Sequence, residues 1–100
     1  MADPGIEAIV GTEPPQRYLT ARGLRGSSWS AGPGTWFPEH RHARTKHLFV
    51  TRGSISFNGV EVSAPTGVRI GAGTVHEALA GRAGVQCVEA FEGDPATTHA

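Results

Sequence analysis

The chain has 100 residues, which is enough for one domain around one hydrophobic core. Its nine basic and nine acidic side chains cancel, which argues against nucleic acid and anionic membrane surfaces as partners, and no stretch approaches the roughly 20 apolar residues of a membrane span. Cys87 is the only cysteine, so the chain can form neither an internal disulfide nor a cysteine-based zinc cluster.

The first residues predict an arm more than a core element. Residues 1–16 contain several glycines and prolines among few large apolar side chains, which is typical of a flexible N-terminal arm. Residues 6–10 leave a second option open, because this apolar patch could dock as an edge strand or swap onto a partner subunit. Residues 18–24 have a weak pattern and predict a short strand or a turn. The start of the chain has no basic segment followed by an apolar one, so we expect a cytoplasmic protein.

Short strands are predicted from residue 27 onward. Fourteen glycines and seven prolines, with apolar residues in short runs, favour brief strands joined by tight turns. Asn58-Gly59 is the strongest hairpin signal, and Gly53 and residues 81–84 predict further turns. The spacing predicts an all-β sandwich or barrel, most economically a jelly roll, over residues 17–93. We expect residues 94–100 to form a frayed tail.

Three histidines form the candidate chemical site. His40 and His42 are two residues apart, so in an extended strand both imidazoles project to the same face. His76 follows a glycine-rich bend at residues 71–75 and is the candidate third ligand. Imidazole suits iron, zinc, nickel and copper, so the pattern predicts a divalent transition metal. The competing interpretation of an isolated His-x-His pair is exposed polar surface.

The spacing around these histidines resembles the cupin superfamily. The stretch G-x5-H-x-H-x3-K-x6-G, which begins at Gly34, is similar to the first cupin motif, and G-x2-H, which ends at His76, is similar to the end of the second. The resemblance covers residues 27–92 and is strongest for small single-domain cupins. It implies a jelly-roll β-barrel (double-stranded β-helix) with a metal inside, frequent dimerisation, and activities from dioxygenation to sugar isomerisation or ligand binding alone.

One departure from the motif concerns the metal directly. Lys46 stands where most cupins have a glutamate ligand, and an ammonium beside a divalent cation is repelled by on the order of several kcal/mol. Lys46 can swing away and leave a three-histidine site with open positions, or the strand can shift by one residue so that His47 becomes a fourth ligand. We favour the first alternative, because Leu48 and Val50 then share the inward face with Lys46.

The remaining candidates are a pocket and a catalytic residue. Trp36 and Phe57 are the candidate aromatic residues of a substrate pocket, with packing in the core or at a dimer contact as the competing account. Lys46 is the candidate catalytic residue, because it could hold a carboxylate or a bound oxygen species. Cys87 is expected to be a buried apolar residue.

The functional hypothesis is a metal-binding monocupin that acts on a small organic molecule at a three-histidine centre. Dioxygenase-like and isomerase-like chemistry both fit, and a homodimer is expected. The alternative is a non-catalytic cupin that binds a small molecule or an anion, in which Lys46 replaces the acidic metal ligand.

Overall fold

A computed structural model describes residues 5–11 and 13–93 of the chain. It contains one helix and seven strands in these ranges, in the order β1 (Ile6–Ile9), α1 (Pro15–Ala21), β2 (Ser27–Ala31), β3 (Trp36–His40), β4 (Lys46–Phe57), β5 (Val60–Ser63), β6 (Gly67–Ile70) and β7 (His76–Phe91). Among the described residues, no helix has the length and apolar character needed to cross a membrane.

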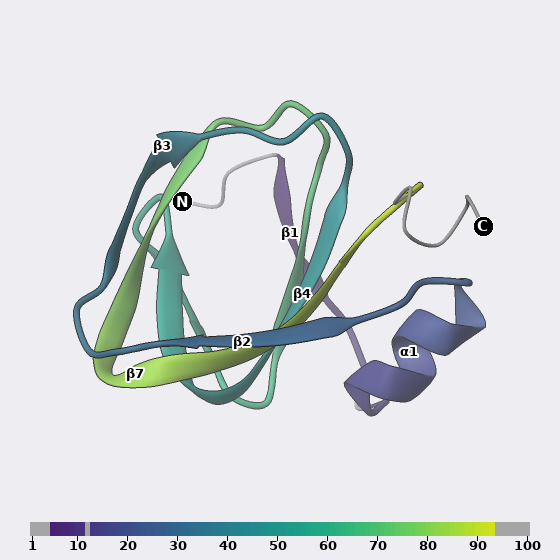
Figure 1. The fold of residues 1–100 in the computed structure, drawn as a ribbon, viewed down its shortest axis with the longest axis horizontal. Coiled ribbons are helices and arrows are strands. Elements are labelled where there is room, and N and C mark those ends of the chain that lie inside the picture. Colours follow the sequence, from purple (N-terminus) through teal and green to yellow (C-terminus); the bar gives the residue numbers. More distant parts are fainter. Residues whose placement is uncertain (1–4, 12, 94–100) are drawn as a thin grey trace.

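The strands form one antiparallel sheet that bends into a barrel (Figure 1). The order of neighbours is β1-β6-β4-β7-β2, while β3 also pairs with β7 and β5 also pairs with β4. The two long strands, β4 and β7, therefore lie at the centre of the sheet and pair with each other. The predicted all-β barrel is confirmed.

The N-terminal part follows one of its two predicted options in residues 6–9 and differs from its prediction in residues 15–21. Residues 6–9 form β1, which pairs with β6 of the same chain and buries Ile6, so this stretch is a docked edge strand and not a loose arm. The prediction of a strand or turn over residues 18–24 is wrong for residues 18–21, because the chain is helical over Pro15–Ala21, while Arg22 and Gly23 form a turn. A helix of seven residues is too short to show a clear period in the sequence, although proline at its first position suits a helix start.

Two predicted turns are bends inside long strands. Gly53 lies within β4 and Gly84 within β7, both with positive φ, and the β4–β7 register shifts beside Gly53. A Cβ at Gly53 would collide with the backbone carbonyl of Gly84, so the two strands can cross this closely only with glycine there. The hairpin prediction at Asn58-Gly59 is confirmed, since Phe57 pairs with Val60 across that turn.

The sheet has an apolar cluster on each face. The inner cluster fills the barrel and includes Leu48, Val50 and Cys87. The outer cluster lies where α1 covers the sheet, and there Leu19 packs with Phe49. The inner face of β4 thus has the parity predicted from Leu48 and Val50. The predicted frayed tail, residues 94–100, lies outside the described residues.

Candidate metal centre

The three candidate histidines lie close together at one end of the barrel. His40 ends β3 and pairs directly with His76, the first residue of β7, and their ring centroids are 4.3 Å apart. The ring of His42 lies 4.8 Å from that of His40 and 5.2 Å from that of His76. One nitrogen from each ring can be chosen so that all three lie within 4.8 Å of one another.

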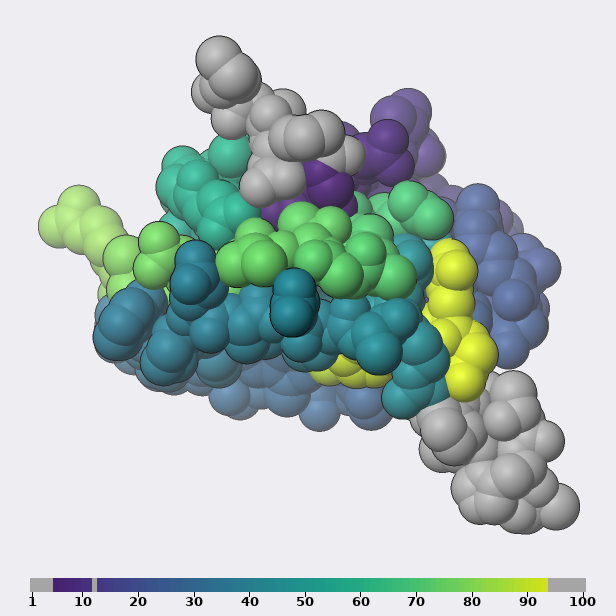
Figure 2. Space-filling view, turned by 90° about the horizontal axis from the view of Figure 1, so that it is seen from above, coloured from purple at the N-terminus to yellow at the C-terminus, as the bar shows by residue number. Residues whose placement is uncertain are grey.

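His42 reaches the cluster from a loop and not from the strand. β3 ends at His40, and the loop that follows is tied to the bend before β7 by two hydrogen bonds. The amide of Gly73 donates to the carbonyl of His42 at 2.8 Å, and the amide of Ala72 donates to the hydroxyl of Thr45 at 3.2 Å. Figure 2 shows these two segments, blue-teal and green, side by side on one face of the molecule.

Backbone carbonyls set the proton positions on two of the rings. Nδ1 of His40 lies 2.7 Å from the carbonyl oxygen of Pro38, and Nδ1 of His76 lies 2.9 Å from that of Thr74. A carbonyl only accepts, so each Nδ1 carries the proton and donates it. In the neutral ring Nε2 then keeps its lone pair, which is the arrangement of metal-binding histidines.

His42 is held neutral and ready to bind. Its Nε2 is buried and has no hydrogen-bond partner among the described residues. The pKa of His42 is lowered from 6.5 to about 4, first by burial and then by electrostatic interaction with Lys46, His40 and His76, against the opposing effect of Glu89. At neutral pH, metal binding by this ring therefore displaces no proton.

The cluster fits a transition-metal ion. Nitrogens that share one ion at about 2.1 Å lie about 3 to 4 Å from one another, so small side-chain rotations would bring the three together. Three imidazoles leave coordination positions open. The buried Nε2 of His42 is a polar atom that such an ion would satisfy.

A cavity of about 240 Å³ adjoins the histidines inside the barrel. Its wall combines aromatic, aliphatic and charged side chains: Trp29, Phe37, His40, Lys46, Leu48, Ile55, Phe57, His76, Ala78 and Glu89. His40 and His76 thus connect the histidine cluster to a partly open, mostly apolar space.

The structure places Lys46 on the inward face of β4, where it lines this cavity. Its Nζ lies 3.2 Å from Oε1 of Glu89, and the two side chains are 10% and 17% exposed. Lys46 is therefore near the histidines, as strand parity predicts, but its charge is paired with a carboxylate from β7.

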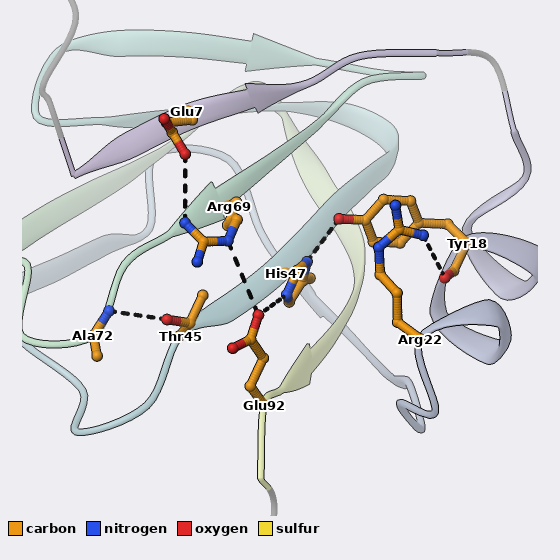
Figure 3. A network of polar contacts seen from close by, with 8 residues as sticks. All are labelled: Glu7, Tyr18, Arg22, Thr45, His47, Arg69, Ala72 and Glu92. Carbon is orange, nitrogen blue, oxygen red and sulfur yellow. Dashed lines mark hydrogen bonds and ion pairs between the residues drawn. The ribbon is translucent and has the colours of Figure 1, made fainter.

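The alternative with His47 as a fourth ligand does not match the structure. His47 points to the opposite face of β4, where its Nε2 donates to Oε2 of Glu92 at 2.7 Å and its Nδ1 accepts from the hydroxyl of Tyr18 at 2.8 Å (Figure 3). Glu92 also lies 4.0 Å from Nε of Arg69, which contacts Glu7 on β1. His47 thus belongs to a network that joins α1 and β1 to the barrel.

Of the two predicted pocket residues, the structure brings one to the cavity. Phe57 lines it, whereas Trp36 is 60% exposed and its indole N–H contacts Glu77 on the outside. The parity argument for Trp36 assumed an unbroken strand, but the register shifts between Phe37 and His40, so Phe37 faces inward in its place.

Glu89 and Trp29 are among the cavity residues that were not predicted from the sequence. The indole N–H of Trp29 donates to Oε1 of Glu89 at 2.8 Å. The signal for Glu89 was a lone carboxylate that shares strand parity with Cys87 and Phe91 on an otherwise apolar face.

Burial, aided by Glu89, raises the pKa of the Cys87 thiol to about 12, so it remains protonated and is no nucleophile.

Comparison with solved structures identifies the architecture. An RmlC-like cupin from Shewanella frigidimarina NCIMB 400 matches with a TM-score of 0.58 at 18% identity, over 68% of this chain and 64% of that protein. A cupin domain from Bordetella pertussis Tohama I matches with a TM-score of 0.52 at 16% identity, over 91% of this chain and 96% of that one. The chain has the cupin fold.

A larger enzyme also contains this cupin fold. A salicylate 1,2-dioxygenase from Pseudaminobacter salicylatoxidans matches with a TM-score of 0.57 at 16% identity, over 90% of this chain but 27% of that protein. This chain spans only part of the first structures matched, namely 64% of the first and 46% of the second. Neither a protein-family model nor a curated protein sequence matches the chain.

Proposed function

We propose that this cupin-fold chain binds one divalent transition-metal ion through His40, His42 and His76 and acts on a small organic anion in the adjoining cavity. The observation that carries the proposal is the convergence of three ring nitrogens within 4.8 Å, with the buried Nε2 of His42 lacking a hydrogen-bond partner among the described residues. Iron, zinc, nickel and copper are the candidate ions.

The size and lining of the cavity support a small ligand with an apolar body. A volume of about 240 Å³ corresponds to about eight water molecules, which suits a compound of about ten non-hydrogen atoms. Trp29, Phe37 and Phe57 supply aromatic walls that exclude water from the bound ligand. Three neutral imidazoles leave the full charge on a bound dication, which favours an anionic or enolisable group there.

The arrangement supports two reaction classes. When bound, a divalent metal polarises an oxygen atom of the substrate and acidifies coordinated water. His40 and His76 are oriented for this role by the carbonyls of Pro38 and Thr74. Dioxygenase-like and isomerase-like chemistry are both compatible with such a centre, and the salicylate 1,2-dioxygenase that shares the fold is a dioxygenase.

The alternative of a metal-free anion sensor is less well supported. That function needs the charge of Lys46 to attract the ligand, but Lys46 already pairs with Glu89 at 3.2 Å. Homodimer formation and a cytoplasmic location stay predictions from the sequence.

Elemental analysis of the purified protein tests the proposal. We expect about one iron, zinc, nickel or copper ion per chain, and its loss in His40→Ala and in His76→Ala. His47→Leu is the matched control, because it removes an imidazole outside the cluster and should leave the metal content unchanged. A metal content far below one per chain after reloading with each of the four ions would refute the proposal.

Oxygen consumption then separates the two reaction classes. The metal-loaded protein would be mixed with small aromatic and hydroxy acids, and dissolved oxygen and product would be followed together. Substrate loss with matching oxygen uptake indicates a dioxygenase, whereas an isomeric product without oxygen uptake indicates an isomerase.

A further inference from the structure

The cavity contains a carboxylate that the three-histidine site does not by itself explain. We propose that Glu89 is a positioning residue that compensates the charge of Lys46 and thereby allows a divalent metal to bind beside a lysine. This inference rests on the proposed function, because it concerns the affinity of the same site for its ion. Glu89 on β7 then supplies the negative charge that β4 does not, because Lys46 stands where most cupins have a glutamate ligand.

The position of Glu89 in the sheet suits this role. β7 lies between β4 and β2, and Glu89 pairs with Leu48 on one side and with Ser27 on the other. Lys46 and Trp29 are its diagonal neighbours on the same face, and diagonal neighbours are within reach of long side chains. One oxygen, Oε1, accepts from both, at 3.2 Å from Lys46 and 2.8 Å from Trp29. Two donors from two strands therefore fix this carboxylate inside the barrel.

Phe91 lies close to both His42 and Lys46, so it gives an upper limit for the distance between the Lys46 ammonium and the His42 ring. The ring of His42 lies 5.0 Å from the ring of Phe91, and Nζ of Lys46 lies 5.2 Å from the same ring centroid. The ammonium and the His42 ring are therefore no more than about 10 Å apart. At such a distance inside a barrel, an unpaired charge still acts on an ion held by His42.

The expected size of this effect is large enough to measure. Coulomb's law for a dication and an ammonium about 10 Å apart, at an effective dielectric constant of about 20, gives a roughly hundredfold loss of metal affinity, which salt and solvent reduce to about tenfold. A carboxylate paired with that ammonium cancels most of the loss. Glu89 should therefore improve metal binding without being a ligand.

A purely structural role for Glu89 makes a different prediction. If the carboxylate only held Trp29 and Lys46 in place, any change of Glu89 or Lys46 would loosen the cavity and weaken metal binding. Charge compensation predicts opposite signs for the two residues instead. Loss of the negative charge weakens binding, and loss of the positive charge strengthens it.

A double-mutant cycle read out as metal affinity tests the proposal. Zinc affinity would be measured by competition with a chromogenic chelator for the wild type, Glu89→Gln, Lys46→Met and the double variant. We expect about tenfold weaker binding in Glu89→Gln, severalfold tighter binding in Lys46→Met, and an affinity within about threefold of wild type in the double variant. Glutamine keeps an oxygen that can accept from Trp29, so the first variant changes charge more than shape.

Two controls accompany the cycle. Glu61→Gln removes an exposed carboxylate on β5 that does not line the cavity, and its affinity should equal that of wild type. Thermal unfolding of each metal-free variant shows whether it is folded under the assay conditions. Should Glu89→Gln not fold, the sign of the change in Lys46→Met still decides, because a structural role predicts weaker binding there.

The outcomes separate this inference from the proposed function. If wild-type protein binds zinc but Glu89→Gln binds it equally well, or the double variant is as weak as Glu89→Gln, the inference is overturned and the metal site stands. If wild-type protein binds neither zinc nor another of the four candidate ions, both are overturned.

Discussion

Substitution of His47 separates a structural histidine from the candidate ligands. His47 is 3% exposed, and its two ring nitrogens contact Tyr18 and Glu92. Leucine has a similar volume, so His47→Leu removes both hydrogen bonds without opening a large cavity. Glu92 regains water, because its side chain is 47% exposed. The hydroxyl of Tyr18 stays buried and loses its partner, which costs about 1 to 3 kcal/mol.

We therefore expect His47→Leu to lower the free energy of unfolding in urea by about 2 kcal/mol, with an unchanged denaturant slope. Adding Tyr18→Phe should recover about half of the loss, because removal of both partners leaves no buried polar group unsatisfied. Metal content of the folded protein should stay at the wild-type level in both variants. Loss of the metal in His47→Leu, with stability unchanged, would refute this assignment and favour the shifted strand register.

Three other predictions follow from the packing and charge of the described residues. In metal-free protein the free energy of unfolding should fall by on the order of 2 kcal/mol as the pH drops from 6.5 to 4. The reason is that His42 of the unfolded chain takes up a proton in that window, whereas His42 of the folded chain, with a pKa of about 4, does not. In His42→Leu this pH-dependent loss should be absent when the free energy of unfolding is measured by urea titration at each pH. Gly53→Ala should lower the free energy of unfolding by more than about 2 kcal/mol and Gly59→Ala by about 1 kcal/mol, because both glycines have positive φ but only a Cβ at Gly53 would meet backbone atoms of another strand. Equal losses of stability in denaturation curves would contradict the close crossing of β4 and β7. Phe37→Ala should lower the free energy of unfolding by about 2 kcal/mol and Trp36→Ala by less than about 0.5 kcal/mol. The reverse order in thermal unfolding would favour the unbroken strand in which Trp36 faces inward.

Much of the inner face of the barrel follows from strand parity. In β4, Lys46 shares its face with Leu48 and Val50, and the structure has all three inside. The period of two is strict wherever pairing is regular, so such a prediction holds over a straight stretch of strand. His40 and His76 meet for a second reason, the direct pairing of the first residue of β7 with the last of β3.

The errors occur where pairing is irregular or the element is short. The register shift between Phe37 and His40 exchanges the faces of Phe37 and Trp36. Pro38 lies in that stretch and is a signal for such an irregularity, but proline alone does not say in which direction the register shifts. Gly53 and Gly84 were predicted as turns, because a glycine at a bend inside a strand and a glycine in a turn look alike in sequence. Only the pairing partner on the other strand distinguishes them.

Glu89 shows what a motif comparison leaves out. Most cupins have a glutamate ligand four residues after the second histidine of the first motif, and Lys46 at that position argues against a strong metal site. The carboxylate lies instead on the neighbouring strand, 43 residues further along the chain, and contacts that same lysine at 3.2 Å. Metal affinity depends on the summed charge around the ion and not on which strand supplies it. A lysine at the ligand position is therefore compatible with a metal site when the adjacent strand carries its counter-charge.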